Sequence, residues 1–227
     1  MLGLGNSLIK GGVTGPTIVT DGLVLKHNYD AGAVVPVSDG AAYFDGTDDY
    51  IDLGSQTNSG SDLTATAWVY LTVSQVAPVI SFGDFLVRFQ DATDLRVWAD
   101  VSGTSSNVTV PSVLNKWTHI AVSSDAGVNS VYTDGVLRET ETDTTLSTGA
   151  RASYIGRYSS GYFAGYICNV GIWSATSTQE QIKTIMWKDY PSLTDSEKTN
   201  LVSWWNLDFP IGSTVPDYHS NNYGTLS

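Results

Sequence analysis

Short runs in which apolar and polar residues alternate recur along the chain, separated by Gly, Asp, Asn and Ser. An apolar residue at every second position is typical of a strand with one buried face, and clusters of turn residues mark where strands end. The pattern predicts strands at residues 22–27, 41–44, 50–53, 63–71, 79–82, 85–90, 95–101, 117–123, 129–133, 136–140, 152–155 and 165–173. Many short strands at this spacing predict an all-β fold in which two antiparallel sheets form a sandwich.

One segment near the carboxyl end departs from this alternation. Ser177 and Glu180 have the spacing of a capping box, in which each residue satisfies a free backbone N–H of the other. They predict one short helix that begins near Ser177 and docks on the sandwich through an apolar stripe, Ile182, Ile185 and Met186. Thr194 and Glu197 form a second capping box, which predicts a short helical turn.

The two ends of the chain differ in pattern from its middle. Residues 1–20 are rich in Gly, Thr and Ser and predict an extended amino-terminal arm, which either orders on a partner or is a disordered terminus. Residues 21–190 form the predicted sandwich domain. The last segment, 191–227, contains a stretch at 201–208 that is similar to residues 23–30. It is predicted to pack on the sandwich or on a neighbouring subunit.

The composition excludes several classes of protein. A net charge of −12 with only 11 Lys and Arg argues against nucleic-acid binding, which needs clustered basic residues. No apolar run approaches the roughly 20 residues of a membrane-spanning helix, and the amino terminus lacks the pattern of a secretory signal. Cys168 is the only cysteine, so no intrachain disulfide can form. We therefore expect folding in a reducing cytoplasm, with Cys168 as a small core residue.

Several motifs in order carry a family resemblance. The run at 163–173, together with the helix start at 177–182, resembles the closing signature of the concanavalin A-like, laminin G-type jelly rolls, which include the pentraxins. Further motifs of that family match residues 43–51, 63–69, 116–122 and 131–136, the last as a two-residue Asp-Gly hairpin. The resemblance runs nearly continuously from about residue 42 to 186. It implies an antiparallel two-sheet jelly-roll sandwich with one short helix.

The resemblance also shows where calcium ligands of relatives are replaced. In pentraxins a Glu-Gln-Asp loop supplies some of the calcium ligands. The matching residues here are Arg157, Tyr158 and Ser159. An arginine in place of a carboxylate argues against a cation there, because calcium takes about six to eight oxygen ligands. Many laminin G-type domains carry Asp-Glu in the closing strand, where this chain has Cys168 and Asn169.

A second group of carboxylates remains as a possible metal site. Asp45, Asp48 and Asp49 crowd one loop and offer enough oxygens to hold calcium. The alternative is a turn in which the aspartates accept backbone N–H groups. No EF-hand spacing accompanies them, so calcium is possible but not favoured, and no other cofactor is expected.

Aromatic residues near loops provide a candidate carbohydrate-binding site. Exposed rings with Asp, Asn or Arg beside them are typical of sugar recognition. The predicted set is Asp84, Arg88, Trp98, Tyr158 and Tyr162. The alternative is that these aromatic residues pack in the core or at a subunit interface.

No catalytic site is predicted. Glu139, Glu141 and Asp143 alternate after the predicted hairpin and would share one face of an extended chain, but they do not match the Glu-x-Asp-x-x-Glu strand of glucanases with this fold. They are better explained as an acidic edge strand that prevents strand-to-strand aggregation. The three histidines have neither triad nor metal-site spacing. The chain is therefore predicted not to be an enzyme, with a glucanase kept as a third hypothesis.

Two functions remain. The first is a structural protein of a bacteriophage virion, a capsid-decoration or fibre subunit that binds a capsid or tail protein after assembly in the host cytoplasm. Its motivation is the lack of a signal and a disulfide, the terminal segments, and an opening at residues 1–8 that is similar to laminin G-type proteins of marine phage genomes. The second is a soluble lectin or adhesin that binds a cell-surface glycan. A homo-oligomer is expected.

Overall fold

The computed structural model describes residues 37, 40–103, 105–142, 146–208 and 212–227. They belong to one compact unit, Val35–Ser227. The predicted arm at 1–20, the predicted strand at 22–27 and the similar stretch at 23–30 lie outside the described residues.

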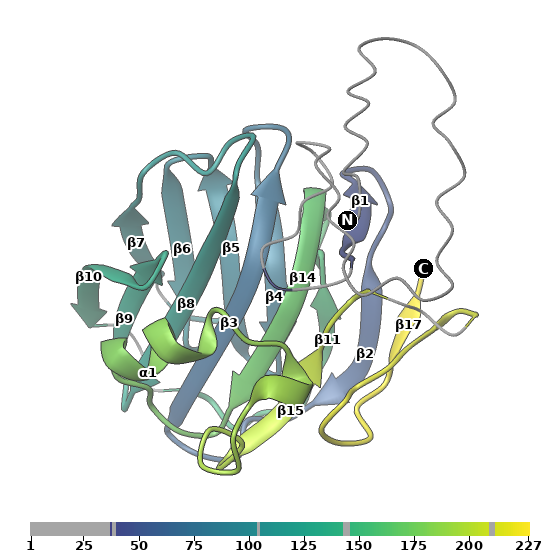
Figure 1. Cartoon of the computed structure of the whole chain (residues 1–227). Helices are drawn as coiled ribbons and strands as arrows, with labels where there is room; N and C mark the ends of the chain where they lie inside the picture. Colours follow the sequence, from purple (N-terminus) through teal and green to yellow (C-terminus); the bar gives the residue numbers. More distant parts are fainter. Residues whose placement is uncertain (1–36, 38–39, 104, 143–145, 209–211) are drawn as a thin grey trace, which may run out of the picture. The chain divides into compact units, whose positions relative to one another are not determined.

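Two antiparallel sheets face each other in this unit (Figure 1). The seven-stranded front sheet consists of β1 (Ala42–Asp45), β14 (Ala164–Trp173), β3 (Asp62–Leu71), β8 (Trp117–Asp125), β9 (Val128–Thr133) and β10 (Val136–Thr142), with β15 (Leu201–Trp205) paired to β14. The eight-stranded back sheet consists of β16 (Thr214–Val215), β17 (Gly224–Leu226), β2 (Ile51–Gln56), β11 (Arg151–Ile155), β4 (Ala77–Phe82), β5 (Phe85–Asp91), β6 (Asp94–Trp98) and β7 (Ser106–Thr109). A separate hairpin joins β12 (Arg157–Tyr158) and β13 (Gly161–Tyr162). The predicted all-β antiparallel jelly-roll sandwich is confirmed.

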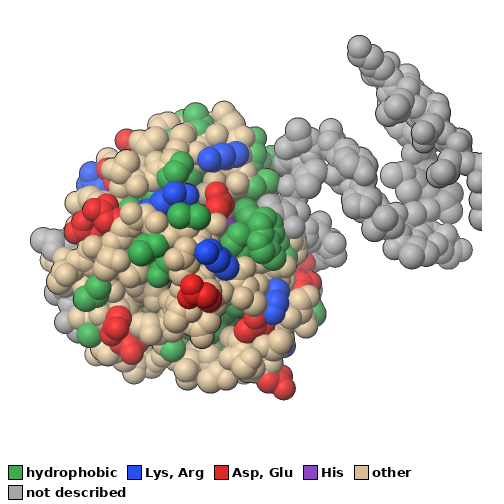
Figure 2. Space-filling view, turned by 60° about the vertical axis from the view of Figure 1, so that its left-hand side comes forward, with side chains coloured by type: hydrophobic (Ala, Val, Ile, Leu, Met, Phe, Trp, Pro, Cys, Tyr) green, Lys and Arg blue, Asp and Glu red, His purple; other side chains and the backbone are tan. Residues whose placement is uncertain are grey.

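The surface is mixed in character. Figure 2 shows separate acidic and basic side chains around one block of hydrophobic side chains on the side turned forward. Trp187, just after the helix, is 58% exposed. Within the part of the chain that the structure describes, no helix has the length and apolar character needed to cross a membrane.

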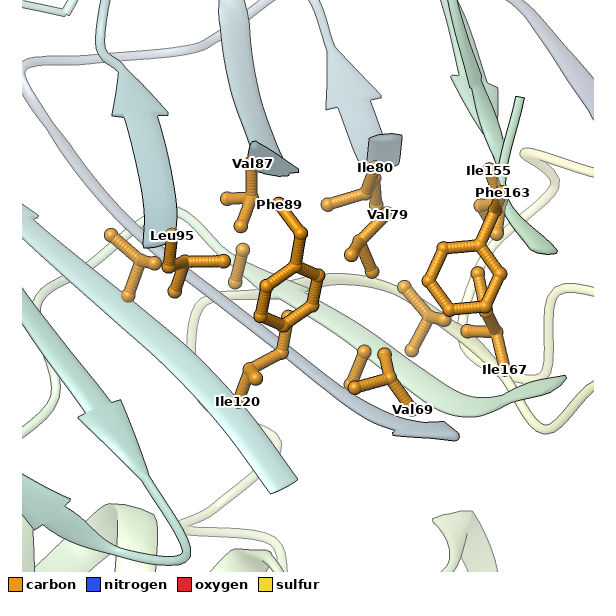
Figure 3. Close-up of a cluster of buried hydrophobic side chains, with 14 of the residues drawn as sticks. Val69, Val79, Ile80, Val87, Phe89, Leu95, Ile120, Ile155, Phe163 and Ile167 are labelled. Carbon is orange, nitrogen blue, oxygen red and sulfur yellow. The ribbon is translucent and has the colours of Figure 1, made fainter. Parts of the chain in front are cut away.

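The core lies between the two sheets. In the back sheet the register aligns one row of buried apolar side chains on neighbouring strands, Ile51, Ile155, Ile80, Val87 and Val97. Val69, Ile120 and Ile167 of the front sheet lie opposite this row (Figure 3). Burying a side chain of this size contributes roughly 1.5–3 kcal/mol, so this layer holds the sheets together.

The helix α1 spans Gln179–Ile185 and begins slightly later than predicted. Its N-cap is Thr178, whose hydroxyl accepts the N–H of Gln181, while the Gln181 side chain accepts the N–H of Thr178. The capping box predicted at Ser177 is therefore wrong. Ser177 instead donates its N–H to the hydroxyl of Ser123 at 2.9 Å, which ties it to β8 before the helix begins.

The predicted apolar stripe of α1 is confirmed, since all of its members are buried, Ile182, Ile185 and Met186. Trp68 of β3 donates its indole N–H to the carbonyl of Met186 at 2.7 Å and so ties the helix to the front sheet. Cys168 and His119 are also buried, as expected of structural residues. Burial raises the pKa of the Cys168 thiol, which keeps it protonated.

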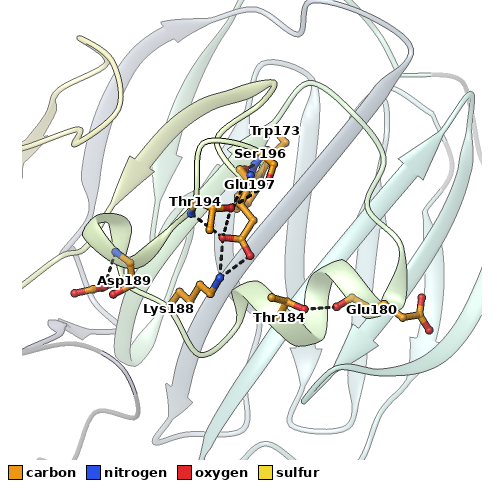
Figure 4. A network of polar contacts seen from close by, with 9 residues as sticks. Trp173, Glu180, Thr184, Lys188, Asp189, Thr194, Ser196 and Glu197 are labelled. Atoms are coloured by element: carbon orange, nitrogen blue, oxygen red, sulfur yellow. Dashed lines mark hydrogen bonds and ion pairs between the residues drawn. The ribbon is translucent and has the colours of Figure 1, made fainter.

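The second predicted capping box is confirmed. Thr194 donates its N–H to Glu197 Oε2 at 2.8 Å, and Glu197 donates its N–H to Thr194 Oγ1 at 3.3 Å. Lys188 Nζ lies 2.6 Å from Glu197 Oε1, and Trp173 donates its indole N–H to the Glu197 carbonyl at 2.8 Å (Figure 4). Burial alone would raise the pKa of Glu197, but the hydrogen bonds from Lys188 and Thr194 together lower it.

The carboxyl-terminal segment supplies strands to both sheets. β15 pairs with β14 of the front sheet, and β17 pairs with β2 of the back sheet. The Asp217 carboxylate fixes the connection between them by accepting the N–H groups of Trp204 at 3.0 Å and His219 at 2.9 Å. The alternation pattern does not predict these strands, β7, or the β12–β13 hairpin. β12, β13 and β17 have only two or three residues each and take their conformation from the neighbouring strand.

The β9–β10 hairpin forms at the predicted place. Asp134 and Gly135 have φ values of 51° and 69°, as a two-residue hairpin turn requires. β10 is the edge strand of the front sheet, and its Glu139 is exposed and its Glu141 half-buried, which agrees with the predicted acidic edge for these two residues. A hydrogen bond between their carboxyl groups raises the pKa of Glu139. Asp143 lies outside the described residues.

Candidate functional site

The outward face of the back sheet brings aromatic and basic side chains together. Arg88 of β5 lies directly opposite Arg96 of β6, and Tyr154 lies in β11 of the same sheet. The residues beside them along the chain are in the core, Val87, Val97 and Ile155. Successive side chains of a strand point to opposite faces, so Arg88, Arg96 and Tyr154 point outward.

Three tyrosines surround one arginine on this face. The guanidinium carbon of Arg157 lies 4.5 Å from the ring centre of Tyr50, 5.0 Å from that of Tyr154 and 5.8 Å from that of Tyr162. Tyr50 and Tyr154 meet edge to face with their centres 5.5 Å apart. All four side chains are half-buried. We call Tyr50, Tyr154 and Tyr162 around Arg157 the tyrosine cluster.

A glycine places Arg157 in this cluster. Gly156 has a φ of +83°, and a Cβ at this position would lie 2.5 Å from the Phe44 ring, so only glycine fits without displacement. Its N–H donates to the Val79 carbonyl at 3.0 Å. The chain can therefore turn sharply after the buried Ile155 and carry Arg157 to the surface.

The β12–β13 hairpin connects the tyrosine cluster to a second group. A Cβ on Gly161 would lie 3.3 Å from the Pro78 ring, so the hairpin rests closely on β4. Pro78 is paired with Arg88 in the register of β4 and β5. Tyr158, the residue after Arg157, consequently lies near enough to Arg88 to interact with its charge.

Arg88 forms the centre of the second group. Its guanidinium carbon lies 4.7 Å from the ring centre of Trp98, and its Nη2 donates to Gln90 Oε1 at 3.2 Å. Burial, and then the charge of Arg96, lower the pKa of Arg88. The tyrosine cluster, Tyr158, Arg88 and Trp98 together form what we call the arginine–tyrosine face.

The predicted carbohydrate-binding residues divide in the structure. Arg88, Trp98, Tyr158 and Tyr162 all lie on the arginine–tyrosine face. Asp84 does not join them. It lies between β4 and β5, is only 4% exposed and forms an ion pair with Arg151 of β11, so its carboxylate serves the packing of the sheet.

The aspartate loop after β1 forms a turn with converging carboxylates. One oxygen each from Asp45, Asp48 and Asp49 can lie within 4.8 Å of the others. Asp45 Oδ1 accepts the N–H of Thr47 at 2.7 Å, and Asp49 Oδ2 accepts the N–H of Asp45 at 3.0 Å. The Thr47 bond is the largest influence that lowers the pKa of Asp45. Turn formation thus engages the carboxylates of Asp45 and Asp49, and calcium in this loop stays the less favoured interpretation of the sequence.

The residues that match the pentraxin calcium loop do not fit a cation. The Arg157 guanidinium occupies that place among three aromatic rings, and a divalent cation would be repelled by it. The two closing-strand positions, Cys168 and Asn169, are buried within β14.

The sequence also identifies relatives. Residues 45–183 match a laminin G-type family model described as the concanavalin A-like lectin/glucanases superfamily. The chain belongs to this superfamily. No curated protein sequence matches the chain. The superfamily includes both lectins and glucanases, so membership gives the fold and leaves the activity to be argued from the site.

Solved structures with the same superfamily architecture include sugar-binding proteins. A candidate carbohydrate-binding protein from Bacteroides ovatus has a TM-score of 0.65 and 21% identity, over 82% of this chain and 57% of its own. The chain thus spans little more than half the length of that protein. A heptameric SAP-like pentraxin from Limulus polyphemus has a TM-score of 0.53 and 16% identity, over 63% of this chain and 79% of its own. The CBM40 of a Ruminococcus gnavus IT-sialidase, bound to α2,3-sialyllactose, has a TM-score of 0.50 and 10% identity, over 65% of this chain and 98% of its own.

The arginine–tyrosine face of this superfamily member includes residues that the sequence pattern does not single out. Tyr50 and Tyr154 belong to predicted strands, and nothing in those strands marks them as surface residues. Arg157 is noted in the sequence only as a replacement for a calcium ligand. The signal that could have identified them is their alternation with core residues, Ile51 and Ile155, which places the tyrosines on the outward side.

Proposed function

We propose that the chain is a glycan-binding module that recognises sugars on its arginine–tyrosine face. The observation that carries this proposal is the position of two guanidinium groups against aromatic rings, Arg157 on Tyr50 and Tyr154, and Arg88 on Trp98. Ligand sites commonly combine aromatic surface with a few polar groups that fix orientation. Aromatic rings can pack against the C–H faces of sugars, while arginine N–H groups donate to their oxygens.

The structural relatives support the same proposal. The Bacteroides ovatus protein is named as a candidate carbohydrate-binding protein, and the CBM40 was solved with a bound sialylated sugar. Their identities to this chain are too low to transfer residues or a specific ligand. They therefore favour the ligand class, and the contacts on the arginine–tyrosine face suggest where the ligand lies.

A glycan array tests the proposal. We expect the wild-type protein to bind a subset of glycans, and Trp98→Ala and Arg157→Ala each to weaken that binding. Trp187→Ala is the matched control, because Trp187 is exposed but contacts Trp68 of the front sheet. Absence of binding to every glycan, or equal losses in Trp187→Ala and Trp98→Ala, would reject the proposal.

The same proposal includes binding without catalysis. Glu139 and Glu141, whose carboxyl groups contact each other, lie on the edge strand β10 and not on the arginine–tyrosine face. A groove of about 440 Å³ beside α1 is lined by Glu180 and Glu197, and the Glu197 carboxylate is bound to Lys188 and Thr194. We expect no reducing ends to be released from β-glucans. Product that disappears in Glu139→Gln would instead favour the glucanase hypothesis.

A role on a virus particle stays a prediction from the sequence. Glycan binding is compatible with a capsid-decoration or fibre subunit, but the arm on which assembly would depend, residues 1–20, lies outside the described residues. We also propose, on the sequence alone, that the protein is located in the virion, binds a capsid or tail protein and forms a homo-oligomer. Antibody labelling of particles from the phage fraction of the source tests them by electron microscopy. Label on heads or fibres is expected, and unlabelled particles would reject the virion role.

A further inference from the structure

Arginine is concentrated on one side of this acidic protein. The net charge of the chain is −12, yet four of its five arginines lie in the back sheet or its hairpin, Arg88, Arg96, Arg151 and Arg157. The lysines of the described residues lie on or beside the front sheet and α1. Because the arginine–tyrosine face is the part of the surface where guanidinium groups gather, it is the place where an anion would be attracted.

These four arginines fall into two kinds. Arg96 Nη2 lies 3.3 Å from Asp94 Oδ2, and Arg151 is paired with Asp84, so both have carboxylate partners within the protein. Arg88 and Arg157 have none among the described residues. Arg88 stacks on Trp98 and Arg157 on the tyrosine cluster.

Stacking leaves the binding edge of a guanidinium group available. The aromatic ring covers the flat face of the group, while the N–H donors lie in its plane. Among the described residues, Arg88 gives one bond to Gln90, and Arg157 makes only a long bond of 3.5 Å to the Ser159 carbonyl. The planar fork of N–H groups matches carboxylate and sulfate oxygens, and such charge-assisted bonds are among the stronger hydrogen bonds in proteins.

The surroundings of Arg88 add a second argument for an anion. Arg96 lies directly opposite it, and like charges in that position destabilise a sheet. The Nε–H groups of both arginines are buried without an acceptor among the described residues. Asp94 is paired with Arg96 and offsets part of the repulsion at Arg88 as well, and Asp91 is engaged in the β5–β6 turn through Thr93. Arg88 is left with an unfavourable neighbour that an anionic ligand would offset.

We propose that the arginine–tyrosine face selects glycans that carry negative charge, with Arg88 and Arg157 each binding an anionic group of the glycan. Tyr158 follows Arg157 in β12 and lies near enough to Arg88 to interact with its charge, so the hairpin connects the two arginines. In this proposal the rings contact the sugar while the arginines contact its charged substituents. This inference rests on the proposed glycan-binding function and narrows its ligand class. The anionic group is a carboxylate or a sulfate, which have the same recognition chemistry.

Dextrans with one backbone and different substituents test the selectivity. Binding of neutral dextran, carboxymethyl dextran and dextran sulfate is measured by calorimetry on the full chain. We expect the charged polymers to bind about tenfold or more tightly than neutral dextran, and added salt to weaken that binding. The two charged polymers distinguish the two anionic groups. A site for carboxylates should bind carboxymethyl dextran more tightly than dextran sulfate, and a site for sulfates should show the opposite order.

Variants then assign the selectivity to these arginines. Arg88→Gln and Arg157→Gln should each reduce binding of the charged polymer about tenfold, whereas Arg138→Gln, on the edge strand β10, should leave it unchanged. If a glutamine variant fails to fold, Arg88→Lys and Arg157→Lys keep the charge and remove the planar fork, and a partial loss of binding is expected.

Equal binding of neutral and charged dextran would overturn the inference but retain the proposed function. Loss of equal size in Arg138→Gln would also overturn it, and absence of binding to the dextrans and to the glycan array would reject both.

Discussion

The outward faces of the two sheets both carry aromatic side chains, but these have different neighbours. On the front sheet Tyr43, Tyr166, Tyr70 and Trp117 lie in register on β1, β14, β3 and β8. The centres of successive rings are 5.1, 6.0 and 5.7 Å apart. We call this row the aromatic ladder. On the back sheet the corresponding rings lie against arginines.

The difference separates stabilising aromatic contacts from contacts suited to binding. Rings of the ladder are tilted or edge to face with one another, an arrangement that satisfies the quadrupoles of both partners and links four strands. Rings of the arginine–tyrosine face support guanidinium groups whose donors remain partly unused. Substitutions on the front sheet should therefore affect folding, and substitutions on the back sheet should affect the ligand.

The largest expected effect comes from acid and acts on the front sheet. His119 is buried beside Trp68, and burial lowers its pKa to about 3. In the unfolded chain a histidine takes up a proton below about pH 6.5, which the folded protein resists, so stability falls by about 1.4 kcal/mol per pH unit from there down to the folded pKa. At pH 4 the loss relative to pH 7 is about 3 kcal/mol.

Urea unfolding at pH 7 and pH 4 measures this loss. His119→Gln should be less stable than wild type at pH 7 but should lose less stability on acidification. Binding of a sulfated glycan at pH 5 is the control on the other face, because arginine and sulfate both stay charged. Identical acid sensitivity in the two proteins would show that His119 is not the group responsible.

The next effect is loss of the ladder. Tyr166 contacts Tyr43, Tyr70 and Trp117, so Tyr166→Ala removes several ring contacts at once. We expect a loss of about 2 kcal/mol in the free energy of unfolding and a fall in Tm of about 4–8 °C. Glycan binding should not change. Thermal unfolding checks this, with Tyr43→Ala at the exposed end of the ladder as the milder comparison; weakened binding in Tyr166→Ala would contradict the separation of the two faces.

A smaller free-energy change, in glycan binding, is expected from substitution of Tyr154, and it tests whether the arginine–tyrosine face is the binding site. Tyr154→Ala removes a ring on which Arg157 rests, so affinity for the glycan should fall about tenfold, or about 1.4 kcal/mol. Tyr154→Phe keeps the ring and should retain most of the affinity. Calorimetric titration of both variants measures the difference. If the phenylalanine variant loses as much as the alanine variant, the phenolic hydroxyl and not the ring is the binding group.

The sequence predicts the long strands well because their pattern reflects the core directly. β3, β8 and β14 are rich in buried residues, and their predicted positions agree with the structure to within a few residues. The short strands β7 and β16 have four and two residues, too few for a clear pattern in sequence. Each is a strand because the neighbouring strand along the chain, β6 or β17, offers it a partner edge.

The candidate site could be predicted only in part for the same reason. Trp98, Arg88 and Tyr158 stand out as aromatic and basic residues near loops. The tyrosine cluster depends on the pairing of β2 with β11, which brings Tyr50 and Tyr154 together. These residues are far apart in the sequence, so a local pattern cannot predict that they meet. Asp84 looks like a sugar ligand in sequence, but the fold supplies Arg151 from a distant strand as its partner.

The smallest expected effect is that of removing calcium. Because Arg157 stands where pentraxins place carboxylates, we expect EDTA to leave glycan affinity unchanged within about twofold. The measurement is the same titration with excess EDTA and with added calcium. Loss of binding in EDTA that calcium restores would contradict this prediction and direct attention to the aspartate loop. Asp45→Asn together with Asp49→Asn would then abolish the calcium response if that loop holds the ion, while the arginine–tyrosine face would still set which glycan is bound.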